Sequence, residues 1–429
     1  MKRLLAAALL VAGCGDDGEG AAAGSSGAAP SSSSSGVDAT SSGEDAVSGT
    51  TAQPVSSSTG GSSSSSESSS SSTGGSAVCG DGVHEPGELC FGDVIAITGV
   101  GGSPSGIDAG DFDGDGNLDL AVAATGTTAV TILHGDGTGE MEVVASLAAG
   151  FQPRGIAVAD LDGDDDLDVA VANIGTNYVG VYRQDEAEWG AQQPEPGGMG
   201  TRAVAAADVD EDGVVDLVAA GEDSNSVEVM LGLGDGTFDS ATGFAVGPRP
   251  YDVAVGDFNG DEHVDVVVPI FGGTTIDVLL GGGDGTFGPA VGHTVASAPR
   301  SVEVVDFDDD GAKDVLAPSF DAQLVSLVRG QGDGDFMPFV ALPVGQGPYS
   351  STAADMNADG RPDLVSVARD AGTVSIVTEN DDGTFSELEL FVGLSPLELV
   401  VGDFNNDGSP DVAATDAFGE AVAVLPSNP

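Results

Sequence analysis

The chain has 429 residues, with 11 Lys and Arg against 70 Asp and Glu, which gives a formal net charge of −59 at pH 7. A balance this acidic argues against nucleic acids and anionic lipid surfaces as partners and favours cations. Hydrophobic residues make up 40% of the chain, enough for a large core, but aromatic residues reach only 5% and glycines number 67. This mixture suits thin strands and tight turns better than helices.

The N-terminal sequence MKRLLAAALLVAGC has a basic start, an apolar run over residues 4–12 and a small residue before Cys14. The run is too short to span a bilayer, so we predict that residues 1–13 are a cleaved export signal. VAGC resembles the lipobox of bacterial lipoproteins, which implies that Cys14 is lipidated and becomes the new N-terminus. The expected location is the bacterial cell envelope, with the lipid as the only membrane contact. Gly15 after the cysteine favours the outer membrane or cell surface.

Residues 14–78 are dominated by Ser, Gly, Ala and Thr, with runs such as SSSSSESSSSSTGGS. This composition cannot bury a core, so we predict a disordered tether behind the lipidated cysteine. In the next segment, CGDGVHEPGELC (79–90), an oxidising compartment favours a disulfide between Cys79 and Cys90. The segment resembles short disulfide repeats of bacterial surface proteins. A zinc site that adds His84 is the alternative, but it has only three ligands and no matching spacing.

An acidic motif recurs through the rest of the chain. Successive copies begin 49, 48, 49, 49, 49 and 48 residues apart, which indicates a regular internal repeat over residues 91–429. The seven copies are DFDGDGNLD (111–119), DLDGDDDLD (160–168), DVDEDGVVD (208–216), DFNGDEHVD (257–265), DFDDDGAKD (306–314), DMNADGRPD (355–363) and DFNNDGSPD (403–411).

Alternating apolar runs surround each acidic loop. In the fourth copy they are PYDVAVGD before the loop, VDVVVPI after it, and TIDVLLGGGDGTF, which ends in a Gly-Asp-Gly turn before a looser run. Period-two alternation, broken by Gly and Asp turns about every 8–12 residues, indicates strands. Four strands in a unit of nearly 50 residues describe a propeller blade, so the predicted fold class is all-β.

The ends of the repeat region are phased to close a ring. The last unit stops at AVAVLPSNP, after its third strand. The missing strand is found in FGDVIAITGVGGSP (91–104), which parallels FGPAVGHTVASAP (287–299), the fourth strand of an earlier unit. We therefore predict that the N-terminal strand completes the C-terminal blade and removes an exposed sheet edge.

The pattern D-x-[DN]-x-D-G-x-x-D followed by GDGTF resembles the FG-GAP/VCBS repeat family, which includes the propeller of integrin alpha subunits. The resemblance covers residues 91–429. It implies a seven-bladed β-propeller of four-stranded blades. It also implies that the acidic loop joins the first and second strands of each blade and binds calcium.

Calcium also suits the loops on chemical grounds, because it takes six to eight oxygens at about 2.3–2.6 Å and carboxylates at alternate positions of a tight loop converge. The seven loops contain 30 of the 70 acidic residues. Asp-rich turns held only by side-chain to backbone hydrogen bonds are the alternative. Such turns need no acid at positions one, five and nine of every copy. In the first loop the expected ligands are the side chains of Asp111, Asp113, Asp115 and Asp119 and the carbonyl of Asn117.

We expect up to seven structural calcium ions, one per loop. Asp165 and Glu262 replace the turn glycine, and three loops have Asn at position three, so these loops should bind more weakly. The other predicted ligands are Asp160, Asp162, Asp164, Asp166 and Asp168; Asp208, Asp210, Asp212 and Asp216; Asp257, Asn259, Asp261 and Asp265; Asp306, Asp308, Asp310 and Asp314; Asp355, Asn357, Asp359 and Asp363; and Asp403, Asn405, Asp407 and Asp411.

The sequence contains no HExxH or G-x-S-x-G motif, and the four histidines fall at unrelated repeat positions. We therefore expect no catalytic residues and a monomeric, non-enzymatic binding or adhesion platform for an unknown protein or glycan. A lectin or a secreted enzyme acting on polysaccharide is the alternative. Acidic residues converging in the central channel would favour the enzyme.

The second unit is the most irregular, because VYRQDEAEWGAQQPEPGGMGTR (181–202) replaces the usual turn and contains Trp189, the only tryptophan. Trp189 could contact a sugar or a protein partner. The alternative is that it stands in for the Phe of GDGTF, as in Phe238 and Phe287, and packs between blades.

Overall fold

The computed structural model describes residues 89–185, 188–380 and 382–427. All regular elements in these ranges are β-strands, and none of the described segments is a helix able to cross a membrane. The predicted signal peptide, lipidated Cys14, tether and Cys79 lie outside the described residues. Cys90 is described and buried.

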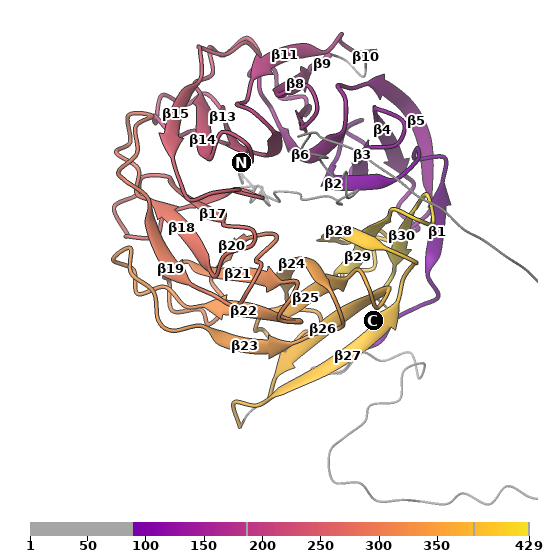
Figure 1. The fold of residues 1–429 in the computed structure, drawn as a ribbon. Helices are drawn as coiled ribbons and strands as arrows, with labels where there is room; N and C mark the ends of the chain where they lie inside the picture. Colours follow the sequence, from indigo (N-terminus) through magenta and orange to yellow (C-terminus); the bar gives the residue numbers. More distant parts are fainter. Residues whose placement is uncertain (1–88, 186–187, 381, 428–429) are drawn as a thin grey trace, which may run out of the picture. The chain divides into compact units, whose positions relative to one another are not determined.

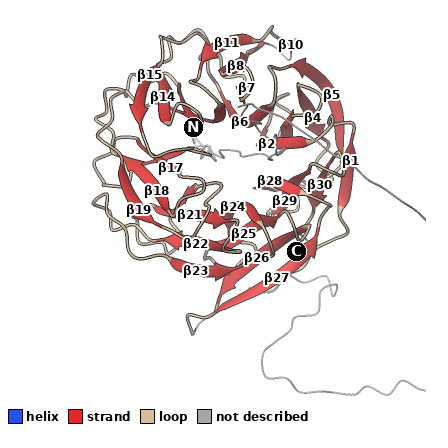
Figure 2. Ribbon diagram, viewed as in Figure 1, coloured by secondary structure: helices blue, strands red, loops and turns tan. Residues whose placement is uncertain are grey.

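The strands form seven four-stranded antiparallel sheets arranged as a ring, which confirms the predicted seven-bladed propeller (Figures 1 and 2). Each sheet runs from an inner strand near the ring centre to an outer strand at the rim. Blade 1 contains β2 (Pro104–Gly110), β3 (Asp119–Ala124), β4 (Ala129–Gly135) and β5 (Met141–Ala148); blade 2 contains β6 (Pro153–Ala159), β7 (Asp168–Asn173), β8 (Tyr178–Tyr182) and β11 (Gln193–Pro196); blade 3 contains β12 (Thr201–Ala207), β13 (Asp216–Gly221), β14 (Ser226–Met230) and β15 (Thr242–Ala245).

The remaining blades repeat this order. A separate two-stranded hairpin, β9 (Gln184–Asp185) and β10 (Glu188–Trp189), is the insertion of blade 2. Blade 4 contains β16 (Ala254–Gly256), β17 (Asp265–Pro269), β18 (Thr275–Leu279) and β19 (Val291–Thr294); blade 5 contains β20 (Glu303–Val305), β21 (Asp314–Ser319), β22 (Leu324–Val328) and β23 (Val340–Pro343); blade 6 contains β24 (Pro348–Ala354), β25 (Asp363–Ala368), β26 (Thr373–Glu379) and β27 (Phe385–Phe391); blade 7 contains β28 (Pro396–Gly402), β29 (Asp411–Asp416), β30 (Ala421–Leu425) and β1 (Ile95–Thr98).

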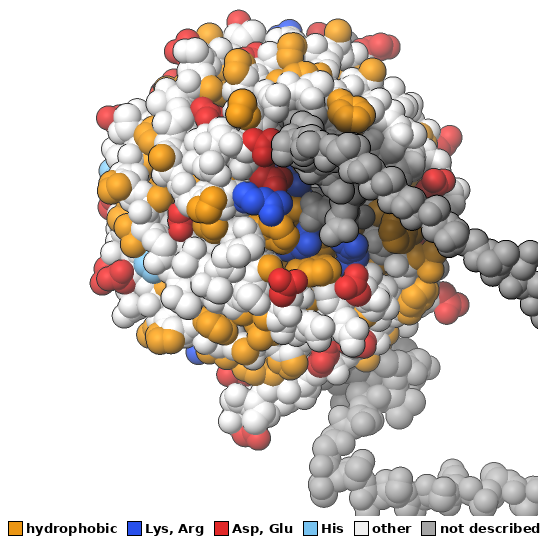
Figure 3. Space-filling model, viewed as in Figure 1, with side chains coloured by type: hydrophobic (Ala, Val, Ile, Leu, Met, Phe, Trp, Pro, Cys, Tyr) orange, Lys and Arg blue, Asp and Glu red, His pale blue; other side chains and the backbone are white. Residues whose placement is uncertain are grey.

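The core lies between neighbouring blades. All residues of the second strands β3 and β7 are buried, because each of these strands packs against a blade on both of its faces. One apolar cluster joins Ile132 and Val130 of blade 1 to Val171 and Ile156 of blade 2. The outer strand β5, in contrast, has mostly half-buried and exposed residues, since one of its faces meets solvent. Acidic side chains are scattered over the surface, whereas Lys and Arg gather near the ring centre (Figure 3).

The ring closes as predicted, because β1 pairs antiparallel with β30 as the outer strand of blade 7. Ile95 lies opposite Val424, and Ile97 lies opposite Val422. The closing strand therefore joins residues near the start of the propeller to its last strand.

We expect Ile97→Ala to lower the free energy of unfolding by about 2–4 kcal/mol, because Ile97 is buried in the core shared by blades 7 and 1. The neighbouring Thr98 is exposed, so Thr98→Ala is the matched control and should change stability by less than about 0.5 kcal/mol. Denaturant unfolding measures both. Equal effects of the two substitutions would show that closure does not depend on this packing.

Candidate metal centres in the acidic loops

Each acidic loop joins the first and second strands of its blade, as the family resemblance implied. In blade 1, β2 ends at Gly110, the loop begins at Asp111, and Asp119 is both the last loop residue and the first residue of β3. The same arrangement recurs in all seven blades, so the seven loops lie at the same end of the ring.

The carboxylates at the start of a loop accept hydrogen bonds from the loop's own backbone. In blade 1 the Asp111 carboxylate accepts hydrogen bonds from the backbone N–H groups of Asp115, at 3.1 Å, and Gly116, at 3.0 Å. Asp113 accepts a second bond from the Asp115 N–H, at 3.0 Å. The loop backbone therefore holds these carboxylates around one centre.

Among the described residues, three carboxylates converge in four of the seven loops, with ligand oxygens within 4.8 Å of one another. Two buried oxygens in these groups, Asp162 Oδ1 and Asp306 Oδ1, have no hydrogen-bond partner. An oxygen-only donor set with unsatisfied carboxylate oxygens fits a hard cation such as calcium. The groups are Asp111, Asp113 and Asp115; Asp160, Asp162 and Asp168; Asp208, Asp210 and Asp216; and Asp306, Asp308 and Asp310.

The loops with Asn at position three are organised differently. Asn259 Nδ2 donates to the Asp261 carboxylate at 2.9 Å, and Asn405 Nδ2 donates to Asp407 at 3.0 Å. In the sixth loop Asn357 makes the same contact with Asp359 at 3.3 Å. The amide thus donates a hydrogen bond to the carboxylate at position five, and weaker binding in these loops stays a prediction.

The acid at position nine has a structural task that the sequence did not reveal. Asp119 is fully buried, and its two oxygens accept the backbone N–H groups of Phe112 and Gly135, both at 2.8 Å. It thereby ties the start of the loop to the end of the third strand. A carboxylate has about four lone-pair sites, so it can hold these donors and still face a cation.

Burial raises the pKa of the position-nine carboxyls, although the backbone donors oppose this effect. Protons therefore compete with a cation for these groups close to neutral pH. The pKa is raised to about 7 for Asp168 and Asp363 and to about 6 for Asp216, Asp265, Asp314 and Asp411.

Position six of the loop has a positive φ angle, as the turn glycine indicated. Gly116 has φ 91°, and the residues that replace glycine, Asp165 and Glu262, have φ 74° and 71°. Position four is also left-handed, at Glu211 (φ 61°) and Asp309 (φ 56°) for example, which we did not anticipate. Two left-handed positions per loop give the backbone its tight curl, and they are strained only where the residue is not glycine.

We expect Glu262→Gly to raise the free energy of unfolding by about 0.5–1 kcal/mol, because glycine adopts this φ angle without strain. Glu262→Gln is the control, since it removes the same charge but keeps the side chain on the strained backbone. Thermal melting of both variants separates the two effects. If both variants are stabilised equally, charge and not strain is responsible.

Several loops have a histidine or arginine side chain beside them. His134, Arg183 and Arg329 each lie 23 residues after the first Asp of their unit, a shared register that we missed. His134 Nδ1 lies 3.1 Å from Asp113, and Arg329 Nε lies 3.1 Å from Asp308. Arg329 therefore already offsets part of the charge of its loop.

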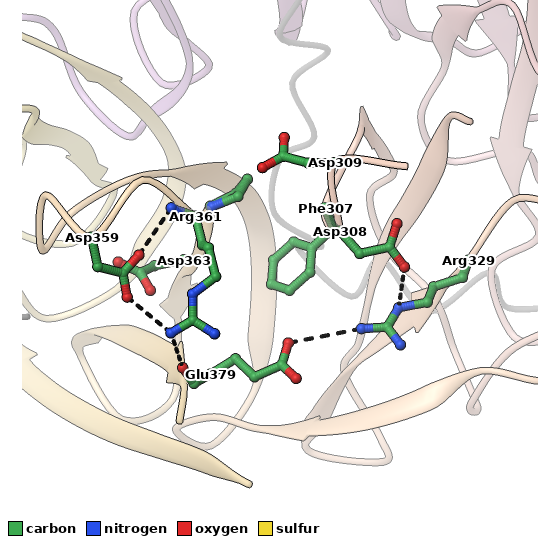
Figure 4. A pocket seen from close by; sticks show the side chains of 9 residues that line it. Phe307, Asp308, Asp309, Arg329, Asp359, Arg361, Asp363 and Glu379 are labelled. Carbon is green, nitrogen blue, oxygen red and sulfur yellow. Dashed lines mark hydrogen bonds and ion pairs between the residues drawn. The ribbon is translucent and has the colours of Figure 1, made fainter. Parts of the chain in front are cut away.

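A small cavity of about 200 Å³ lies between the loops of blades 5 and 6 (Figure 4). Arg329 bridges Asp308 and Glu379 there, and Arg361 contacts Asp359 at 3.1 Å. Both arginines form ion pairs with acidic residues. We therefore interpret this cavity as part of the contact between blades 5 and 6.

Trp189 lies in β10, and its ring packs edge-on against Phe112 of blade 1 at 5.6 Å. Phe336 contacts Phe258 at the same distance in a regular blade, so Trp189 occupies the place of the GDGTF phenylalanine. The side chain is half-buried. A partner contact through its exposed part stays a prediction.

Four carboxyls outside the loops are buried on or beside the inner strands: Asp108, Asp252, Glu303 and Glu398. Asp108 and Asp252 each accept two backbone N–H groups, one of them from the next blade, at Val158 and Val302. Glu303 accepts a 3.3 Å hydrogen bond from Thr352 Oγ1, and burial together with the charges of Asp252 and Asp108 raises its pKa. Asp108 and Asp252 therefore serve as ties between blades, and Glu303 differs from them.

Comparison with known protein families identifies the repeat. The FG-GAP-like repeat model matches residues 111–171, 160–219, 208–268, 306–366 and 355–414, which together span more than half of the chain. The chain belongs to the FG-GAP-like repeat family. The matched segments begin at the acidic loops described above, so the family pattern and the loop geometry coincide.

Two of the similar solved structures share the fold of this FG-GAP propeller at low sequence identity, and a third is similar at a lower TM-score. BBS1N in complex with ARL6DN is 14% identical, with a TM-score of 0.56, over 80% of this chain and 97% of that chain. A putative 6-phosphogluconolactonase from Bacteroides uniformis is 14% identical, with a TM-score of 0.52, over 68% and 86% of the two chains. An N-acetylglucosamine-specific lectin from Agrocybe aegerita is 18% identical, with a TM-score of 0.48, over 80% and 87%. No curated protein matches the chain.

Proposed function

We propose that this FG-GAP propeller is a calcium-stabilised, non-enzymatic binding platform on a bacterial cell surface. The observation that carries the proposal is the convergence of carboxylates in the acidic loops, with buried oxygens that have no hydrogen-bond partner. A cation at these centres would fix the join between the first and second strands of each blade. The opposite ends of the blades are then available to present differing loops to a ligand.

The location follows from the predicted N-terminal segments. A lipid on Cys14 and a Ser-rich tether would hold the propeller away from the membrane, where it could reach a protein or a glycan. The ions are structural in this proposal, because each would hold together the loop that joins the first two strands of its blade.

The test is binding with and without chelator. We expect the full chain to bind a component of a combined glycan and protein array in calcium, and to lose that binding in EDTA as the loops loosen. Retention of full binding in EDTA would contradict the calcium-dependent platform.

Glu303 is the one observation that favours an enzyme acting on polysaccharide, because it is a buried carboxyl with a raised pKa near two further acids. If the protein is such an enzyme, it should cleave polysaccharide at a measurable rate, and Glu303→Gln should abolish the cleavage. Glu387→Gln, on the outer strand β27, is the matched control.

A further inference from the structure

The antiparallel blades give the propeller two different ends. The acidic loops and the turns between third and fourth strands lie at one end, which we call the loop face. The turns between second and third strands, and the connections from each fourth strand to the next blade, lie at the other end. We call this end the arginine face, for the residues described next.

Four arginines gather on the arginine face of a chain that has only 11 basic residues and 70 acidic ones. Lys and Arg side chains are seen together near the ring centre, beside hydrophobic ones (Figure 3). We call the arginines and the rings among them the arginine hub: Arg202, Arg249, Arg300, Arg369, Tyr251, Phe271, Phe320 and Tyr349.

The rings fix the guanidinium groups in place. Arg202 Cζ lies 3.3 Å from the centroid of Tyr251, and the Tyr251 ring stacks on Phe271 at 4.3 Å. Arg300 Cζ lies 4.3 Å from the centroid of Phe320 and 4.9 Å from that of Tyr349. Cation–π contacts of this kind orient the planar donors before any ligand arrives.

The hub follows the repeat. Arg202, Tyr251, Arg300 and Tyr349 each lie six residues ahead of the acidic loop of their unit, and Arg154 has the same place in blade 2. The basic and aromatic residues therefore form an arc over consecutive blades at the inner strands.

Two carboxylates of the same chain already form ion pairs with the hub. Glu222 lies 2.7 Å from Arg249 Nη2 and 3.1 Å from Arg202 Nη1, and Asp370 lies 3.7 Å from Arg369 Nε. The Arg249 side chain is 49% exposed. Arg202 and Arg300 are buried, so carboxylates from solvent would reach the hub through Arg249 and Arg369.

Large apolar side chains are exposed on the same face. They come from connections between blades and from the turn after β29. Polar residues are more common in such exposed connections. Exposed apolar side chains on the same face as Arg and Tyr residues are found at protein–protein interfaces. The residues are Phe151 (58% exposed), Met199 (59%), Leu394 (66%) and Phe418 (65%).

We propose that the arginine face binds an acidic segment of a partner protein, in which Asp or Glu residues are interspersed with large apolar ones. The proposal rests on the binding-platform function and names its partner. The carboxylates would pair with the hub, and the apolar residues would cover the exposed Phe, Met and Leu side chains. An acidic polysaccharide has no large apolar side chains to cover exposed Met, Leu and Phe residues, which favours a polypeptide. A slender segment also avoids the repulsion that a folded acidic protein would meet from a chain of net charge −59.

The test uses the full chain in calcium-containing buffer and three sets of labelled short peptides. The first set contains acidic and apolar residues, the second has the acids replaced by amides, and the third has the apolar residues replaced by Ser. We expect the first set to bind and the other two to bind at least about tenfold more weakly. Equal binding of the amide set would overturn the proposal.

Variants of the protein then locate the site. Arg249→Gln and Arg369→Gln should each weaken binding of the first set by about fivefold to tenfold, because each removes a fixed partner of the carboxylates. Lys313→Gln is the control, since it removes one exposed positive charge from the loop face and should leave binding unchanged. Unchanged binding by both arginine variants would overturn the proposal.

A polygalacturonate arm separates failure of this inference from failure of the platform function. If polygalacturonate binds and no peptide does, the partner assignment is wrong while the platform function stands. If the folded, calcium-loaded protein binds neither peptides nor any component of the array, the platform function itself fails.

Discussion

Removal of calcium is expected to lower the free energy of unfolding of the propeller by roughly 3–10 kcal/mol. Extracellular calcium sites have dissociation constants of about 10⁻⁴–10⁻³ M, and at millimolar calcium each adds on the order of 0.4–1.4 kcal/mol by mass action. Seven such sites give the stated range, which is comparable to the whole stability of a typical domain. Without the ions, 30 carboxyl-bearing residues in seven short loops would also repel one another.

Calorimetry or circular dichroism with calcium and with EDTA measures this effect, and we expect the melting temperature to fall by roughly 5–20 °C in EDTA. Asp136→Asn is the control variant, because Asp136 lies in a solvent-exposed turn outside the acidic loops. It should show the full response to chelation. An unchanged melting temperature in EDTA would contradict a stabilising role for the ion.

The second large effect is expected at position nine of a loop, where Asp216→Ala should lower the free energy of unfolding by about 2–5 kcal/mol. Asp216 is buried, and its oxygens accept the N–H groups of Val209 at 2.8 Å and Gly232 at 2.7 Å. Truncation leaves two buried donors without an acceptor, and each costs about 1–3 kcal/mol. This loss does not depend on the cation, so it should appear both in calcium and in EDTA.

Asp210→Ala in the same loop is the matched comparison. The pKa of Asp210 is raised by burial and by the neighbouring Asp212 and Asp208, so this carboxylate is unfavourable without a cation. Its removal should cost about 1 kcal/mol in calcium and nothing, or a small gain, in EDTA. If the loss in Asp216→Ala disappears in EDTA, the residue is a ligand only and not a tie between strands.

The ring and its closure were predictable because they leave periodic traces in the sequence. The acidic loops mark every unit, and FGDVIAIT stands where a fourth strand is missing at the other end. The buried second strands were harder to anticipate, because β3 is buried on both faces and only its neighbours in other blades show why. Alternation of apolar and polar residues by itself predicts a sheet with one face exposed to solvent.

The sequence placed the acidic loops between the first and second strands, but it did not reveal the separate tasks of their residues, and calcium ligation by them stays a prediction. Asp119 repeats as faithfully as Asp111, and only the structure shows that it binds backbone N–H groups from two segments. The left-handed residue at position four was hidden because Glu211, Asp309 and an alanine occupy it in some loops and glycine in others. His134 and Arg329 occupy the same position of their repeat units. Their contact with the acidic loop depends on the third strand running back towards that loop, which the sequence alone does not show.

The arginine hub was missed for a related reason. Its members come from the inner strands and turns of several blades, and no short sequence window contains more than a few of them. A comparison of corresponding positions across units, six residues ahead of each loop, would have revealed the run of Arg and Tyr.

Calcium stoichiometry tests the central claim most directly. Equilibrium dialysis of the folded chain, followed by metal analysis, should find up to seven calcium ions, with the loops that begin at Asp111, Asp160, Asp208 and Asp306 filling first. Substitution of Asp306 by Ala should remove one of them. A folded propeller that retains no calcium would contradict the account.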